Sequence, residues 1–301
     1  MSTEQDILRE QCKMIFSEKE ELMKVLAQYR TFVPPGHYYS PIPSKEDIQD
    51  YEQKAAILPE TIAGVNLNEQ GQIEIFNEFK KYYSDLPFSH ERNGNLRYYY
   101  LNDFYSYGDA IALFCMLRHL KPKKIIEIGS GFSSAAMLDT NELFFDNRID
   151  CTFIEPYPSR LQQLLKRTDN INLIQKRLQD VAIEEFSSLS RGDILFIDST
   201  HVSKLNSDVN YLIFEIFPHL PSGVYIHFHD IFYPFEYPLS WLKEGRAWNE
   251  VYILRAFLQY NTAFIIKYFG HFMALFHRDK YSEFMPLCLN NPGGNIWIEK
   301  I

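Results

Sequence analysis

The sequence predicts an α/β fold with a doubly wound, mostly parallel seven-stranded sheet that ends in an antiparallel strand. Two observations predict it. From residue 123 onward, short apolar segments alternate with helix-forming segments, as in a parallel sheet built from right-handed βαβ units. Segments such as 194–197 are apolar at every position, which strands covered by helices on both faces require.

The chain before the first strand is expected to form an N-terminal helical cap. Apolar residues recur at three- and four-residue steps within residues 3–30, at Leu8, Cys12, Ile15, Leu22, Leu26 and Tyr29. This seam, which Lys19 interrupts, predicts a helix that packs on its own body or forms a short coiled coil, and so allows a homodimer. Prolines between residues 34 and 43 predict an extended strap. Residues 72–84 are expected to form another helix.

The remaining elements follow from apolar runs and helical segments in alternation. The expected strands are 124–128, 151–155, 171–175, 193–197, 223–229, 263–269 and 295–299. The expected helices are 133–145, 159–167, 180–188, 204–217 and 247–260. The last two strands have no long helix clearly between them, which predicts an antiparallel pair at one sheet edge. We therefore expect a cap at residues 1–95 and a main domain at residues 96–301.

Composition and charge exclude several classes of protein. The 301 residues carry a formal charge of −9, whereas a nucleic-acid-binding protein usually shows a basic face, so no nucleic acid is expected. The absence of about 18 consecutive apolar residues argues against a membrane span. The N-terminus has no apolar signal-peptide core, and four widely spaced cysteines form no metal pattern. These features predict a cytoplasmic protein with free thiols.

A glycine loop directly after the first strand is the most informative motif. The strand ends in Glu127-Ile-Gly129-Ser130-Gly131, and Ser133 opens a helix-forming segment. Glycines let a backbone approach a ligand that a side chain would exclude. Free N–H groups at a helix start suit polar or anionic ligand groups. The motif predicts the binding site of a nucleotide-like cofactor.

Polar residues also follow the next three strands. Glu155 ends the second strand, 24 positions after Gly131, where an acid can hold both ribose hydroxyls. Gln179 and Asp180 follow the third strand, where a polar group near adenine would lie. Asp198 follows the fourth. Because ligands in open α/β sheets bind beyond the carboxyl ends of the strands, these residues predict one shared site.

These motifs, together with the closing antiparallel strands, resemble the class I S-adenosylmethionine-dependent methyltransferases over about residues 95–301. That family has a Rossmann-like fold. The Ser/Thr in place of a third glycine, and polar acids after strands four and five, resemble its small-molecule O-methyltransferases. The resemblance implies that Gly129, Ser130 and Gly131 face the methionine part of S-adenosylmethionine, that Glu155 binds ribose, and that Gln179 or Asp180 lies near adenine. It also places Glu127, Ser133 and Asp198 in the cofactor site.

Two other classes of function stay open at this point. A nicotinamide-dependent oxidoreductase also has a glycine loop, but its pattern needs a third glycine for close helix–strand packing, and Ser134 stands there. Its sheet also lacks the antiparallel ending. The second alternative is a catalytically inactive binding or scaffold protein with this cofactor fold. Such a protein would bind S-adenosylmethionine without turnover and bind partners through residues 3–30.

Methyl transfer to a hydroxyl group of a small molecule needs a group that removes the hydroxyl proton. A histidine base does this near neutral pH, and a divalent cation does it by lowering the acceptor's pKa. His201 follows Asp198 by three positions, and His229 and Asp230 end the fifth strand. We expect Asp198, His201 and His229 to be catalytic, with either histidine as the base.

A metal ion is the alternative device at the same strand ends. The metal-assisted methyltransferases carry paired oxygen ligands after strand five, whereas this chain has His229-Asp230 there. Hard cations prefer oxygen ligands, so this departure counts against magnesium. Asp198, His229 and Asp230 would better suit a transition metal. The aromatic segment 231–248 then leaves the sheet at the cofactor end and is expected to wall the acceptor site.

Overall fold

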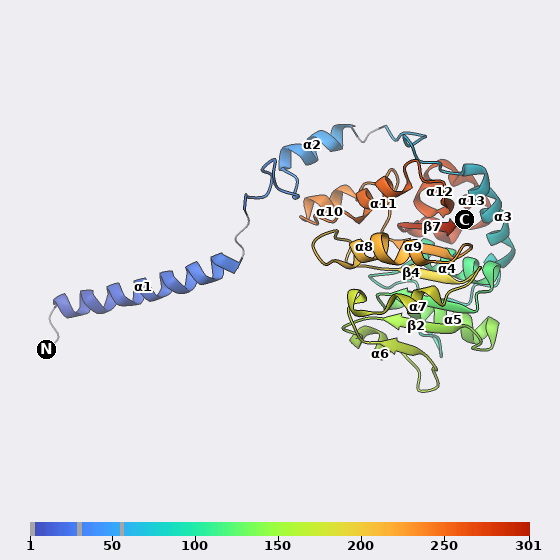
Figure 1. Cartoon of the computed structure of the whole chain (residues 1–301), viewed down its shortest axis with the longest axis horizontal. Helices are drawn as coiled ribbons and strands as arrows, with labels where there is room; N and C mark the ends of the chain where they lie inside the picture. The colour runs from blue at the N-terminus through green and yellow to red at the C-terminus, as the bar shows by residue number, and fades with distance from the viewer. Residues whose placement is uncertain (1–3, 29–31, 55–56) are drawn as a thin grey trace. The chain divides into compact units, whose positions relative to one another are not determined.

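The computed structural model describes residues 4–28, 32–54 and 57–301 (Figure 1). Its contacts divide the chain into two compact units, residues 1–54 and residues 55–301, and each is described by itself. None of the helices in these described residues is both long enough and apolar enough to cross a membrane.

The division at residue 54 differs from the boundary at residue 95 that the sequence predicts. The reason is local packing of the helix α3 (Glu69–Tyr83), which contacts α4 (Tyr107–Leu120) and β6 (Phe264–Phe269). The side chain of Asn68 also donates a hydrogen bond to the β6 carbonyl of Ile266, at 2.8 Å. These contacts join the residues just before 95 to the unit that carries the sheet.

The first unit holds two helices, α1 (Glu4–Gln28) and α2 (Lys45–Lys54). Every side chain described in α1, over residues 6–26, is exposed to solvent. The seam residues between Leu8 and Leu26 are therefore exposed in this unit, and Tyr29 lies outside the described residues. Ser44 caps α2: its hydroxyl accepts from the amide of Asp47 at 3.0 Å, and the Asp47 carboxylate accepts from the Ser44 amide.

The second unit is built on a seven-stranded sheet with the order β3-β2-β1-β4-β5-β7-β6. Its strands are β1 (Lys124–Ile128), β2 (Asp150–Ile154), β3 (Asn172–Ile174), β4 (Ile194–Ile197), β5 (Tyr225–His229), β6 (Phe264–Phe269) and β7 (Asn295–Lys300). The first five run parallel, and β7 lies between β5 and β6, antiparallel to both. The predicted mostly parallel sheet with an antiparallel C-terminal strand is confirmed.

Helices flank this sheet along its whole width (Figure 1). After β1 the α-helices are α5 (Phe132–Phe145), α6 (Ser159–Leu164), α7 (Ile183–Ser187), α8 (Asp208–Tyr211), α9 (Phe217–His219), α10 (Leu239–Lys243), α11 (Glu250–Leu258), α12 (Gly270–Phe276) and α13 (Arg278–Phe284). Shorter turns of other helix types are η1 (Leu178–Asp180), η2 (Leu212–Ile216) and η3 (Pro286–Asn290). Helices α3, α4 and α5 pack side by side, and α7 packs with η2 and α9.

Two helical segments differ from the expectation. The predicted helix at 204–217 begins only at residue 208, because the Ser207 hydroxyl accepts from the amide of Asn210 and caps the chain there. It then passes through the π-helical turn η2 before α9. The predicted helix at 180–188 is shortened to α7, and Asp180 ends the turn η1 instead.

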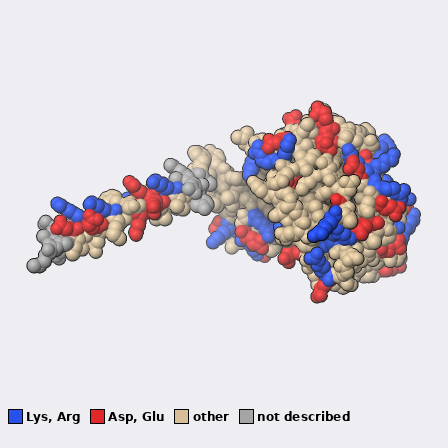
Figure 2. Space-filling view, turned by 90° about the horizontal axis from the view of Figure 1, so that it is seen from below, with Lys and Arg blue, Asp and Glu red and all other residues tan. Residues whose placement is uncertain are grey.

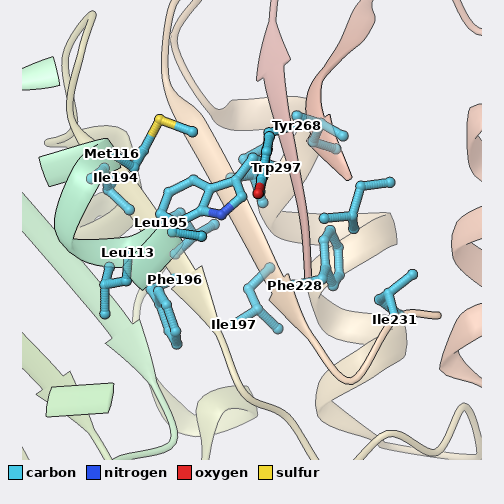
Figure 3. Packing of buried hydrophobic residues seen from close by; sticks show 14 of the residues in the cluster. Leu113, Met116, Ile194, Leu195, Phe196, Ile197, Phe228, Ile231, Tyr268 and Trp297 are labelled. Carbon is cyan, nitrogen blue, oxygen red and sulfur yellow. The ribbon is translucent and has the colours of Figure 1, made fainter. Parts of the chain in front are cut away.

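The core lies where β4, β5 and β7 meet the helices. Figure 3 shows apolar side chains of these strands packed together, with Phe196 and Trp297 among the labelled residues. All four residues of β4 are buried, as the sequence predicts for a strand covered on both faces. The Phe196 and Trp297 rings lie edge to face, with their centroids 6.4 Å apart. This rigid centre fixes where the two neighbouring strands, β4 and β5, end.

Candidate active site

A hollow of about 460 Å³ opens beyond the carboxyl ends of β1, β2 and β4. In the paired strands Ile128 lies opposite both Ile154 and Ile197, so the residues that follow each strand emerge side by side. Of the cofactor residues expected from the sequence, four line the hollow: Gly129, Glu155, Gln179 and Asp198. Three parallel strand ends thus supply one binding site.

The glycine loop brings main chain to the wall of this hollow. Gly129 has a φ of 83°, and a Cβ there would lie 2.3 Å from the carbonyl oxygen of Asp198. Only glycine allows both that angle and that close approach. The neighbouring Ser130 hydroxyl is buried without a hydrogen-bond partner in the protein. An unpaired buried hydroxyl beside a lined hollow fits a polar ligand.

Glu127 is fully buried below the loop rather than in the wall of the hollow. Its carboxyl group accepts hydrogen bonds from the hydroxyls of Ser133 and Ser134, the latter at 2.5 Å. Burial raises the pKa of Glu127 to about 8. Its role in this structure is to tie the end of β1 to the start of α5, and so to shape the loop that Gly131 completes.

The polar residues near the expected ribose and adenine positions divide into two groups. Glu155 uses one carboxylate oxygen to accept from the amide of Tyr157, at 2.8 Å, which leaves the other oxygen for a ligand. Gln179 donates from its side chain to the carbonyl of Asn206, at 2.5 Å. Asp180, in contrast, does not line the hollow and forms an exposed ion pair with Arg177.

Next to the hollow, two histidines and two aspartates meet at the ends of β4 and β5. His201 Nε2 lies 3.5 Å from Asp198 and 3.6 Å from Asp230. His229 Nδ1 lies 3.4 Å from the same Asp198 oxygen. The three residues that the sequence predicts as catalytic are therefore in contact, and Asp198 belongs both to this cluster and to the hollow.

Two further carboxylates complete the cluster, and the sequence did not reveal them. Glu250 of α11 accepts a hydrogen bond from His201 Nδ1, at 2.8 Å. Asp109 of α4 lies 3.6 Å from His229 Nε2 and accepts from the side chain of Asn295 at 2.7 Å. The one available signal for Asp109 is that it is the only acid of α4 and directly precedes an apolar run, residues 110–117.

The pKa values in the cluster reflect this crowding of charges. Burial lowers the pKa of His201, but the carboxylates of Asp198 and Glu250 outweigh it and raise that pKa to about 10. Burial also lowers the pKa of His229, but the carboxylates of Asp230 and Asp198 outweigh this effect. The pKa of His229 therefore lies well above its ordinary value. The imidazoles in turn hold the pKa of Asp198 well below its usual range, against burial. Both histidines carry protons at neutral pH.

The metal that the sequence allowed finds no support in the structure. Over residues 4–28, 32–54 and 57–301, no group of three or more His, Cys, Asp or Glu side chains is arranged to hold a metal ion. The physical reason is that both nitrogens of His229 face carboxylates as hydrogen-bond or ion-pair partners. Asp198, His229 and Asp230 form an ion-pair cluster, not a set of donors that share one empty centre.

His227, two residues before His229, belongs to the core. Its ring stacks on Phe196 with centroids 3.8 Å apart and meets Trp297 edge to face. Burial lowers its pKa well below the ordinary value, so it is neutral. The two rings of His227 and His229 lie on the same face of β5, as strand alternation predicts, but only His229 reaches the cluster.

The aromatic segment between β5 and α11 lies against the cluster. Trp248 packs on His201 with ring centroids 4.5 Å apart. The Arg246 guanidinium lies over the ring of Trp241 at 4.4 Å and forms an ion pair with Glu244. The expected wall of the acceptor site is therefore next to the histidine that the sequence predicts as a base.

Comparisons with known proteins find similarity over the part of the chain that carries the sheet. A family model described as a methyltransferase domain matches residues 126–231, which run from β1 through β5 and end at the residue after Asp230. An uncharacterized protein of Archaeoglobus fulgidus is 35% identical over 166 residues, which are 54% of this chain and 75% of that protein. The mostly parallel sheet with its antiparallel C-terminal strand is the methyltransferase fold. Residues 126–231 thus match a methyltransferase domain, and the sheet that carries them has the Rossmann-like fold of the class I S-adenosylmethionine-dependent methyltransferases.

Solved structures with a similar arrangement share little sequence with this chain. An S-adenosylhomocysteine-bound methyltransferase of Podospora anserina is 14% identical, covers 87% of this chain and 99% of its own, and has a TM-score of 0.42. The plantazolicin methyltransferase BamL, in complex with a substrate analog and S-adenosylhomocysteine, is 15% identical. It covers 62% of this chain and 80% of its own, with a TM-score of 0.41.

Proposed function

We propose that this protein transfers the methyl group of S-adenosylmethionine to a hydroxyl group of a small-molecule acceptor. One observation carries the proposal: Asp198 lines the cofactor hollow and also touches both histidines of the cluster. The two imidazoles of the cluster thus lie where an acceptor would meet a bound cofactor.

The residues that line the hollow fit the cofactor. Glu155 offers a free carboxylate oxygen to the two ribose hydroxyls, and Gln179 lies at the adenine side. The main chain at Gly129 and the unpaired Ser130 hydroxyl suit the polar methionine part. When bound, S-adenosylmethionine supplies a methyl group on a sulfonium ion, which the acceptor oxygen attacks.

The cluster beside the hollow receives the acceptor's proton. Four carboxylates, those of Asp109, Asp198, Asp230 and Glu250, surround two imidazoles, so the cluster keeps net negative charge even when both imidazoles are protonated. An imidazole acts as a base only in its neutral form, so the proton that it carries must first pass to solvent water; a cationic cofactor held beside Asp198 would favour that transfer. His201 or His229 then takes the hydroxyl proton.

The apolar and aromatic surroundings hold the acceptor and exclude water. On the segment that leaves β5, Trp248 packs on His201 and Trp241 packs on Trp248. Four cysteines without a disulfide, at positions 12, 115, 151 and 288, support the further proposal of a cytoplasmic protein.

Calorimetric titration with S-adenosylhomocysteine tests the cofactor half of this proposal. We expect the wild-type protein to bind, and Glu155→Ala to weaken the affinity by roughly 10- to 100-fold, because a hydrogen-bonding charge is lost. A folded wild-type protein that binds no S-adenosylhomocysteine would contradict the proposal.

Turnover on a panel of small hydroxyl compounds, followed by formation of S-adenosylhomocysteine, tests the other half. We expect His201→Ala and His229→Ala to bind S-adenosylhomocysteine nearly as the wild type does. At least one should lose turnover by roughly 10²- to 10⁴-fold. Near-normal turnover in both variants would remove the histidines from the reaction.

A further inference from the structure

We propose that Glu250 is a positioning residue, which holds the His201 imidazole with its proton on Nδ1 and its Nε2 toward Asp198 and the cofactor hollow. The inference rests on the function proposed above, in which His201 takes part in proton removal. It assigns a role to a residue that lies 49 positions further along the chain, on a different element.

The contacts of Glu250 leave it no other task. One carboxylate oxygen accepts from His201 Nδ1 at 2.8 Å, and the other accepts from the hydroxyl of Ser199 at 2.7 Å. The residue is 1% exposed, so neither water nor a substrate reaches it. A buried carboxylate is costly unless it is paired and hydrogen-bonded, and here the imidazole is its charged partner.

The same helix start also fixes the main chain of His201. His201 has a φ of 59°, a left-handed conformation that few residues other than glycine adopt, although histidine is enriched there together with asparagine and aspartate. Its carbonyl accepts from the amides of Asn249 and Glu250, at 3.0 and 3.1 Å. Strained conformations persist only where the surroundings over-determine them, and they gather at functional sites.

Together these contacts orient the ring. When the His201 ring loses one of its two protons, the hydrogen bonds of its nitrogens decide which proton stays, and the carboxylate at Nδ1 keeps the proton there. Nε2 then faces Asp198 at 3.5 Å and Asp230 at 3.6 Å, on the side of the hollow. Trp248 packs on the ring and limits its rotation.

Nuclear magnetic resonance of protein labelled with ¹⁵N-histidine tests this positioning without an acceptor. We expect a low-field proton signal on one Nδ1, assigned to His201 by its loss in His201→Asn, since asparagine tolerates the left-handed conformation. In Glu250→Gln, which keeps the side chain's size but not its charge, this signal should move markedly upfield or vanish. A wild-type protein whose His201 carries its proton only on Nε2 would overturn the inference, whatever the variant does.

Asn249→Ala is the matched control. Asn249 also ties α11 to the same loop, through side-chain hydrogen bonds to the amide of Ser203 at 2.6 Å and to its carbonyl at 3.2 Å, but its side chain does not touch the imidazole. The low-field signal should remain in this variant. If Glu250→Gln, with an unchanged circular dichroism spectrum, keeps the wild-type signal, Glu250 has only a structural role.

Titration of the same proteins with S-adenosylhomocysteine separates this inference from the proposed function. We expect the affinity of Glu250→Gln to stay within about threefold of the wild type, because Glu250 does not line the hollow. If the wild type binds S-adenosylhomocysteine but the His201 signal does not move in Glu250→Gln, only the positioning role is wrong and the proposed function stands. Absence of binding in the wild type defeats the proposed function, even if the His201 signal behaves as expected.

Discussion

The glycine loop and the histidine cluster lie at the same edge of the sheet, but contacts of different range hold them in place. In the loop, Glu127 accepts from Ser133 and Ser134, six and seven positions along the chain. In the cluster, His201 depends on Glu250 of α11, and His229 faces Asp109 of α4, a helix that precedes the whole sheet. The loop is encoded locally, whereas the cluster exists only once distant elements have packed.

Asp198 joins the two regions, so its substitution is expected to have the largest effect. In Asp198→Asn the carboxylate that faces both imidazoles is lost, and with it part of the cluster's negative charge. We expect turnover on a hydroxyl acceptor to fall by roughly 100-fold or more. The affinity for S-adenosylhomocysteine, measured by calorimetry, should fall by a smaller factor.

The matched control for this substitution is Asp146→Asn, which removes a carboxylate that is exposed at the end of α5. It should leave both turnover and affinity as they are. If Asp198→Asn behaved like this control, the two regions would work independently and Asp198 would not connect them.

The locally encoded glycine loop can be tested through the pH dependence of stability that Glu127 causes. The folded-state pKa of Glu127 is about 8, above its unfolded value of 4.5, so its protonated form stabilises the fold fully below about pH 4.5. This stabilisation is lost as the pH rises through 8. Burial is the main cause, and the carboxylates of Asp198 and Glu155 add to it.

Glu127→Gln stays neutral at every pH and fits the same space. Relative to the wild type, we expect the variant to gain on the order of 2–4 kcal/mol in free energy of unfolding between pH 5 and pH 9. Urea unfolding of both proteins at the two pH values measures this difference. If the two proteins differ in free energy of unfolding by the same amount at both pH values, Glu127 is charged over this whole pH range.

The smallest effect on either region is expected from removal of residues 1–30. The described apolar seam residues of α1 are exposed, and we propose that the helix pairs with a second copy of the chain. Light scattering should then show a dimer for the full chain and a monomer for the shortened one. Because no residue of α1 lines the hollow, the affinity for S-adenosylhomocysteine should stay unchanged. If the shortened protein keeps the same number of subunits as the full chain, α1 does not form the interface.

The sequence predicts the parts of this molecule whose causes are local. All seven strands were expected, because each is a short apolar run bounded by turn residues. Gly129, Glu155 and Asp198 were placed correctly at strand ends, and parallel strands bring such residues together without further information. Helix limits were less accurate at 204–217, because a single serine cap decides where α8 begins.

The remainder of the site depends on tertiary packing. Nothing near Glu250 or Asp109 in the sequence indicates a histidine partner, since each pair forms across separate elements. Asp180 has the right residue type at the right spacing, but it pairs with Arg177, three positions before it, and does not line the hollow. Net charge does not locate the site either. Figure 2 shows acidic and basic groups interspersed over the visible surface.

The position of β7 between β5 and β6 affects how the protein is made. As the ribosome releases the chain, β6 has no neighbour in the sheet until residues 295–300 emerge, because only β7 bridges it to β5. Asn295 and Trp297, which support Asp109 and the core, arrive at the same late moment. The nascent protein therefore holds an incomplete histidine cluster and an unpaired strand until residues 295–300 have emerged. Premature termination in this last strand would leave a chain that exposes β6 to aggregation.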